Sequence, residues 1–228
     1  MFKSLVFSLL LTMSSLAFSD PSREELTITS VKITEVETPS EFNPVTNDLF
    51  DKNVVSDIGQ VIGVVDSLIA LGKKIYPIIE AGKPIISSEL PVTHVLPKRT
   101  NEVSDFDLTL SMMENWQMPR SRSYKVVYEN LYGMEVVSFT FTVHFQYGGS
   151  FEGKGKYLTG VLVSATELFV AWGFEFSAST EVVSVTNHGT LANPVAGLSL
   201  RLSWNAKTIV TESQSSKVFH ITGNGLIK

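Results

Sequence analysis

Four histidines are the side chains of this sequence best suited to acid–base or metal chemistry: His94, His144, His188 and His220. No two of them have the three- to five-residue spacing with which one helix or turn presents two imidazoles to a zinc ion. His144 falls on the polar face of a predicted strand and His188 falls in a predicted turn, so we expect both to be solvated or hydrogen-bonded. The sequence therefore predicts no metal site, unless one is assembled from different strands.

Motifs for nucleophilic catalysis and for phosphate binding each lack an essential residue. Segment 197–201 begins like the Gly-x-Ser-x-Gly turn of serine hydrolases, but Arg201 replaces the second glycine. Segment 148–155 has the glycine spacing of a phosphate loop, but Gly155 replaces the Ser or Thr that holds the metal, and a predicted strand follows. The chain has no cysteine, which removes thiol catalysis. We therefore assign no catalytic residue, no metal ligand and no cofactor.

An interaction patch is predicted in segment 112–122, which reads MMENWQMPRSR. Tryptophan, methionine and arginine are the residue types enriched at the centres of protein interfaces. We take Trp116, Arg120 and Arg122 as candidate binding residues on a recognition loop. The competing interpretation is that Trp116 and Met118 cover one end of the core while the arginines stay in solvent, because large aromatic side chains are usually buried.

Composition excludes some classes of protein. The chain has 228 residues, of which 43% are hydrophobic and 18% charged, so it carries enough apolar material for the core of one ordinary domain. Its formal net charge is -5, whereas a protein that grips nucleic acid through phosphates has a basic excess. We therefore expect no nucleic-acid partner.

Residues 1–19 have the pattern of a secretion signal. Lys3 supplies a positive charge, residues 4–16 are mostly apolar, and Ala17 and Ser19 are small residues at the two positions that signal peptidase reads. The apolar run is short for a membrane span. We expect cleavage after Ser19 and an exported protein, periplasmic or extracellular. The lack of any Asn-x-Ser/Thr site favours a bacterial source.

Two segments with different patterns precede the main strands. Residues 20–53 are polar and acidic, with a possible strand at 26–34 that a bulge at Ser30 interrupts. Residues 55–80 carry apolar residues at three- and four-residue steps, with Pro77 near the end, which predicts one amphipathic helix. We expect this helix to pack on the sheet through Ile62, Val65 and Ile69. Residues 54–228, including the helix, are assigned to a single β-rich domain.

From about Asp105 the sequence predicts strands separated by turns. The clearest strand is 137–147, where apolar and polar residues alternate, which is typical of a half-buried strand with one wet face. Further strands are predicted at 157–164, 168–177, 182–186, 196–204, 207–211 and 217–222. The predicted fold is mainly β, an antiparallel β-sandwich with one amphipathic helix before the main strands. Its predicted strand core comprises Val137, Phe139, Phe141, Val143, Phe145, Val170, Trp172, Phe174, Leu200 and Leu202.

These features favour an exported, non-enzymatic binding or interaction module with a protein, glycan or lipid partner. One alternative is a membrane-active protein, similar in outline to pore-forming proteins, in which helix 55–80 enters a membrane surface. A further alternative is a hydrolase whose residues meet only in the folded chain. An exposed aromatic patch beside a loosely attached helix favours the membrane-active alternative, whereas a deep cleft lined by converging carboxylates or histidines favours the hydrolase.

Overall fold

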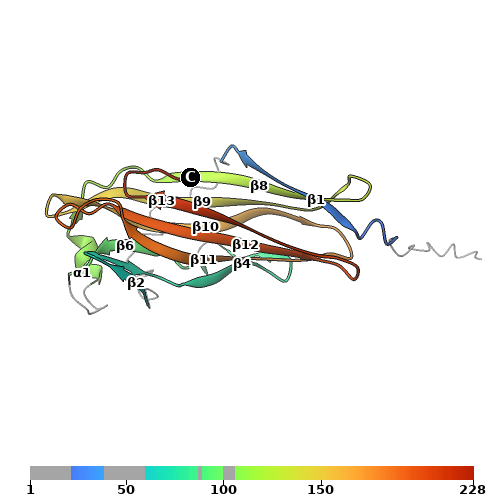
Figure 1. Ribbon diagram of the computed structural model, residues 1–228, viewed down its shortest axis with the longest axis horizontal. Helices are drawn as coiled ribbons and strands as arrows, with labels where there is room; N and C mark the ends of the chain where they lie inside the picture. The colour runs from blue at the N-terminus through green and yellow to red at the C-terminus, as the bar shows by residue number, and fades with distance from the viewer. Residues whose placement is uncertain (1–21, 39–59, 87–88, 100–105) are drawn as a thin grey trace, which may run out of the picture.

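The computed structural model describes residues 22–38, 60–86, 89–99 and 106–228, which form an antiparallel β-sandwich. One sheet contains, in spatial order, β1 (Ile28–Val36), β8 (Arg120–Asn130), β9 (Glu135–Phe151), β10 (Lys154–Val170), β6 (Thr93–Pro97), β3 (Leu68–Leu71) and β2 (Val61–Val65), with β7 (Met113–Glu114) beside β9. The other contains β13 (Glu212–Thr222), β12 (Ala196–Lys207), β11 (Glu175–Asn187), β4 (Ile75–Glu80) and β5 (Lys83–Pro84). The long strands run along the long axis of the molecule (Figure 1).

The aromatic core between the two sheets confirms the alternation predicted for β9. Its five predicted core residues are all buried: Val137, Phe139, Phe141, Val143 and Phe145. Phe139 packs against Phe176 of β11 and Trp204 of β12, with ring centroids 4.9 and 5.8 Å apart. Leu200 and Leu202 of β12 are buried as predicted. Apolar burial and aromatic pairing therefore join the two sheets.

The predicted helix at 55–80 is wrong. Residues 55–59 lie outside the described residues, and the rest form β2, β3 and β4. Asp66, with φ of 51°, turns the chain between β2 and β3, and Gly72, with φ of 144°, follows β3. Valine and isoleucine favour strands because their branched side chains are restricted in a helix. The three- and four-residue steps arose from short strands with apolar residues on both faces. Ile69 is buried, while Ile62 and Val65 are half-buried.

The prediction that Trp172 belongs to the core is also wrong, because its side chain is 74% exposed. β10 ends at Val170 and β11 starts at Glu175, so Trp172 lies in a turn where strand alternation no longer applies. Its neighbours Val170 and Phe174 are half-buried against the core. The strand predicted at 207–211 is likewise mainly a turn, since β12 ends at Lys207 and β13 begins at Glu212.

The N-terminal strand is present as β1, which pairs with β8 and has a register shift between Ile28 and Ser30. This irregularity agrees with the bulge predicted at Ser30. Residues 1–21, which include the predicted signal, lie outside the described residues. The one helix of the described residues, α1 (Phe106–Ser111), is short, and none of the described helices is long and apolar enough to cross a membrane.

Candidate functional site

Trp116 packs on the end of β9. Its indole is half-buried and lies over Gly149, where an added Cβ would come within 2.6 Å of three ring atoms. The backbone N–H of Gln117 donates to the carbonyl oxygen of Tyr147 at 2.9 Å, which holds the segment against the strand. Met118 is 84% exposed and does not share this packing. Trp116 therefore covers the end of the sheet, and glycine at position 149 makes room for it.

Replacing Gly149 by alanine should displace Trp116. The new methyl group would overlap the indole, and overpacking of this kind destabilises a protein by about 1–3 kcal/mol. The shift of the Trp116 indole N–H signal by NMR and the urea midpoint measure the two effects. Gly63→Ala is the control, because a Cβ there would meet Val185 at an ordinary 4.0 Å. Equal effects from the two substitutions would contradict the packing described for Trp116.

Arg120 and Arg122 lie together in a cleft of about 460 Å³ formed with the segment Gly225–Lys228. The Nη1 of Arg120 donates to the carbonyl oxygen of Gly225 at 2.7 Å, and its guanidinium lies 4.8 Å from the centroid of the Tyr147 ring. Both contacts fix Arg120 in place. Arg122 is 3.7 Å from the carboxylate of Glu35, an exposed pair that stabilises little. The cleft contains both predicted arginines, but Trp116 is not part of its lining.

The polar face of β9 is buried, so the predicted wet face is wrong. Ser138, Thr140, Thr142 and His144 are all buried. The Nδ1 of His144 lies 2.7 Å from Ser121 Oγ, and its Nε2 lies 3.2 Å from Ser164 Oγ. Thr142 bonds to the Ser123 hydroxyl, and Ser138 and Thr140 donate to the carboxylates of Glu135 and Glu167. These partners satisfy the polar groups, which is why a row of serines and threonines can be buried.

The Ser121–His144 pair superficially resembles a nucleophile and its general base. Burial lowers the pKa of His144 to about 3, so the ring is neutral near neutral pH and is a weak base. Its full burial also separates the ring from solvent and hence from a substrate. These two properties favour a structural role over a catalytic one.

The other histidines also lie beside hydroxyl groups. His94 Nδ1 lies 2.7 Å from Thr159 Oγ1, and burial lowers its pKa to about 4. His188 and His220 are also within hydrogen-bonding distance of a threonine or serine hydroxyl. The part of the chain that the structure describes has no group of three His, Asp or Glu side chains that could hold a metal ion.

Large apolar side chains are exposed on three turns at one end of the sandwich. The turns are 131–134 between β8 and β9, 171–174 between β10 and β11, and 208–211 between β12 and β13. We call their exposed members the apolar tip: Leu131, Tyr132, Met134, Trp172, Ile209 and Val210. Ile209 is 90% exposed and Trp172 is 74% exposed. The tip lies at the right-hand end of the molecule in Figure 1.

Local hydrogen bonds hold two of these turns in shape. The Oδ1 of Asn130 accepts from the backbone N–H groups of Tyr132 and Met134, and Thr208 Oγ1 accepts from those of Val210 and Thr211. Such side-chain caps are the usual way in which Asn and Thr stabilise turns. The apolar side chains are therefore presented by ordered turns.

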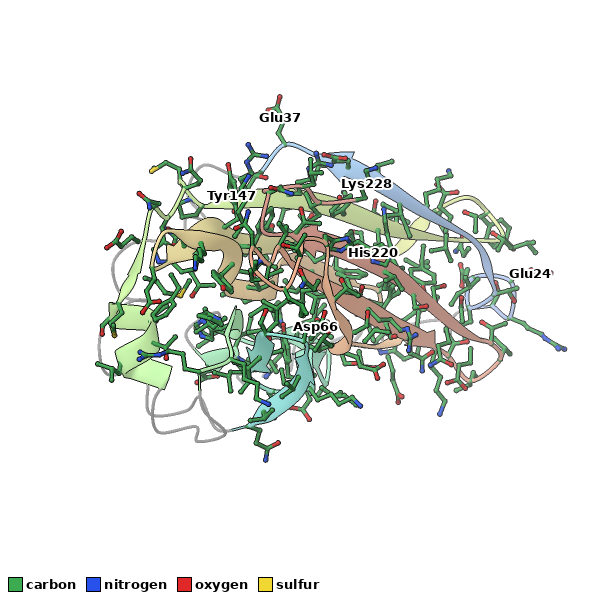
Figure 2. The ribbon with its side chains drawn as sticks, turned by 60° about the vertical axis from the view of Figure 1, so that its left-hand side comes forward. Glu24, Glu37, Asp66, Tyr147, His220 and Lys228 are labelled. Atoms are coloured by element: carbon green, nitrogen blue, oxygen red, sulfur yellow. The ribbon has the colours of Figure 1, made fainter. Side chains whose placement is uncertain are left out.

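The N-terminal turn joins the tip to the rest of the fold. The carbonyl oxygen of Leu26 accepts hydrogen bonds from Thr208 and Thr211, both at 3.1 Å. The Tyr132 hydroxyl donates to a carboxylate oxygen of Glu24 at 2.8 Å, and Figure 2 shows Glu24 at this end of the molecule. The described chain therefore begins beside the apolar tip.

The charges at the edges of the tip turns are mainly acidic. Glu135, Glu175 and Glu212 begin the strands that leave the three turns, and Lys207 ends the strand that enters the last one. The described strand ends around these turns therefore form no basic cluster of the kind that binds an anionic lipid surface.

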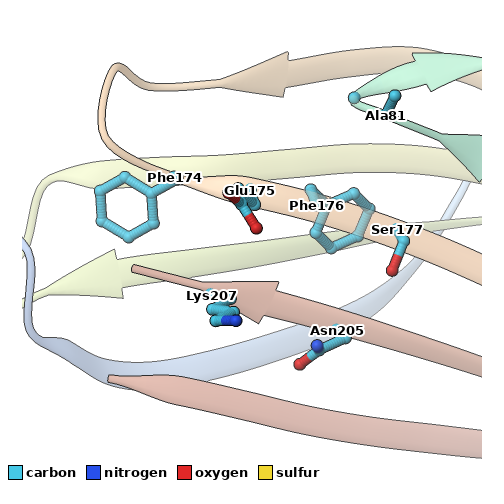
Figure 3. A pocket seen from close by; sticks show the side chains of 8 residues that line it. Ala81, Phe174, Glu175, Phe176, Ser177, Asn205 and Lys207 are labelled. Atoms are coloured by element: carbon cyan, nitrogen blue, oxygen red, sulfur yellow. The ribbon is translucent and has the colours of Figure 1, made fainter. Parts of the chain in front are cut away.

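A pocket of about 510 Å³ lies next to the apolar tip. It is lined by the first residues of β11, the last residues of β12 and the turn between β4 and β5. Figure 3 shows Glu175, Ser177, Asn205 and Lys207 on neighbouring strands around it. Phe174 precedes Glu175 in this lining, and Ala81 of the turn between β4 and β5 also lines the pocket (Figure 3).

Sequence reasoning missed the apolar tip and this pocket. Strand alternation placed Trp172 in the core, Ile209 was placed in the strand predicted at 207–211, and no prediction was made for Tyr132. The sequence did contain an indication of the first turn, because Asn130 and Gly133, residue types that favour turns, flank Leu131 and Tyr132. Apolar residues inside such a turn cannot be buried between the sheets.

No family model matches this chain, and no curated protein or solved structure is significantly similar to it.

Proposed function

We propose that the protein is an exported, non-enzymatic binding module that docks on a lipid membrane surface through the apolar tip. The exposure of Trp172, Ile209 and Tyr132 on three turns at one end of the sandwich carries this proposal. A contiguous exposed apolar patch on a folded protein marks an interaction site. The secretion signal predicted at residues 1–19 supports a location where such a surface is accessible.

The chemistry of the tip favours a lipid interface over a protein partner. Tryptophan and tyrosine concentrate at membrane–water interfaces, where the ring is in an apolar layer and its polar atom stays hydrated. Three separate turns form a protruding, uneven end, which a fluid bilayer can accommodate without a matching shape. Burial of three large side chains at about 1.5–3 kcal/mol each gives roughly 5–9 kcal/mol, enough for reversible docking.

The charges near the tip favour a membrane of zwitterionic lipids. Acidic side chains around the turns would be repelled by an anionic surface, and the described strand ends at the tip form no basic cluster to offset this. Docking should therefore depend on apolar burial and change little with salt concentration. This proposal does not use a helix from segment 55–80.

Sedimentation with phosphatidylcholine vesicles tests the proposal. We expect the purified protein to bind, and the double variant Trp172→Ser with Ile209→Ser to bind at least about ten-fold more weakly, because it loses two of the most exposed apolar side chains. Leu191→Ser is the matched control, since Leu191 is 71% exposed in the connection between β11 and β12, at the other end of those strands. Thermal unfolding checks that all three proteins are folded. Failure of the protein to bind, or equal binding by the two variants, would overturn the proposal.

A further inference from the structure

The pocket beside the apolar tip contains one acidic and one basic side chain from neighbouring strands. Glu175 of β11 and Lys207 of β12 are register partners and so lie on the same face of the sheet. Both are exposed, and neither takes part in an ion pair with another described residue. The pocket therefore presents a positive and a negative charge that do not neutralise each other by direct contact.

Asn205 adds an acceptor that lacks a donor. Its Nδ2 donates to a carboxylate oxygen of Glu212 at 2.8 Å, which fixes the orientation of the amide. The Oδ1 is buried and has no hydrogen-bond partner among the described residues. A buried acceptor without a donor is unfavourable, so a ligand N–H that reached it would be stabilised.

We infer that this pocket binds the head group of a zwitterionic phospholipid that carries a primary ammonium, such as phosphoethanolamine. In this assignment Lys207 contacts the phosphate, and the ammonium donates to Glu175, to Ser177 and, after a turn of the Asn205 amide that exposes it, to Asn205 Oδ1. A primary ammonium has three N–H donors for these three acceptors, whereas a trimethylammonium has none. Glu175 and Lys207 match the two charges of the head group.

The position of the pocket agrees with the membrane docking on which this inference rests. Glu175 follows the turn that holds Trp172, and Lys207 precedes the turn that holds Ile209. When those turns enter the interface, the pocket lies at the level of the polar head groups. Its volume of about 510 Å³ is ample for one head group.

Two binding measurements test the inference. The first compares vesicles of phosphatidylcholine alone with vesicles containing equal parts of phosphatidylethanolamine. The second titrates the protein with soluble O-phosphoethanolamine or phosphocholine and follows the backbone NMR signals of Ser177 and Asn205. We expect about ten-fold tighter binding to the phosphatidylethanolamine vesicles and saturable shifts with phosphoethanolamine alone.

Variants that replace a charged side chain by glutamine test whether the pocket is the source of the preference for phosphatidylethanolamine. Glu175→Gln and Lys207→Gln should each remove the preference for phosphatidylethanolamine. Glu181→Gln and Arg201→Gln are matched controls, because this ion pair lies on the same two strands and the same face but outside the pocket. The controls should keep the preference.

The outcomes separate this inference from the proposed function. Tip-dependent binding that is equal for both kinds of vesicle would overturn the head-group site and leave membrane docking intact. Binding of soluble phosphoethanolamine without any vesicle binding would instead identify a free ligand and overturn the lipid assignment. Loss of the preference in Glu181→Gln as well as in Glu175→Gln would show that the pocket is not its source.

Discussion

Replacing Phe139 by alanine should lower the free energy of unfolding by about 3–5 kcal/mol. Phe139 is 1% exposed, and its ring lies 4.9 Å from that of Phe176 and 5.8 Å from that of Trp204. The substitution removes apolar contact across the two sheets and leaves a cavity. Because domains are stable by about 5–15 kcal/mol, this loss is a large part of the total.

Urea denaturation measures this loss as a shift of the midpoint. The control is Phe169→Ala, which removes the same side chain from β10 at a position that is 49% exposed. We expect it to cost less than about 1 kcal/mol. A loss at Phe169 equal to that at Phe139 would contradict the location of the core between the two sheets.

Lowering the pH from 7 to 5 should destabilise the protein by about 4 kcal/mol through His94 and His144. Burial lowers their pKa values in the folded protein to about 4 and about 3, whereas the unfolded chain has the ordinary value near 6.5. Between these values the unfolded state binds protons that the folded state does not. Stability is therefore complete above about pH 6.5 and falls as the pH decreases.

Urea midpoints at pH 7 and pH 5 measure the effect of pH on stability. His144→Gln keeps polar groups that can bond Ser121 and Ser164, and it should remove about half of the pH effect. The NMR signals of the two rings provide a check that does not depend on the variant. If either ring titrates near pH 6.5 in the folded protein, burial does not control its pKa.

The strand alternation in β9 was enough to predict the sandwich core. Phe139, Phe141 and Phe145 are separated by two and four positions. A strand places residues with this spacing on one face of the sheet. The same rule failed for the opposite face. Ser138, Thr140 and Thr142 look like residues of a wet surface, but their hydroxyls bond to nearby carboxylate and hydroxyl groups and so can be buried.

The helix error has a different origin. In segment 60–80 the residues Val61, Ile62, Val64 and Val65 fill both faces of a strand, so they satisfy helical and strand spacing equally. Periodicity alone cannot separate these alternatives in short apolar runs. The branched side chains and the turn at Asp66 were the better indicators.

The candidate sites could be predicted only in part. Arg120 and Arg122 were identified from residue type, but their cleft depends on Gly225 and Lys228, which are about a hundred residues away. The apolar tip combines three turns that no sequence spacing relates. Its residues become a surface only because β8, β10 and β12 all end at the same end of the sandwich.

The pairing of strands that are distant in the sequence has a consequence for folding. β1 pairs with β8, and β4 pairs with β11, with partners such as Ile75 and Glu181. Contacts of this range make folding slow, on the order of milliseconds to seconds. Neither sheet can be completed while only the first half of the chain is available. Slow completion of the two sheets would keep the chain unfolded for longer during the export that we propose from residues 1–19.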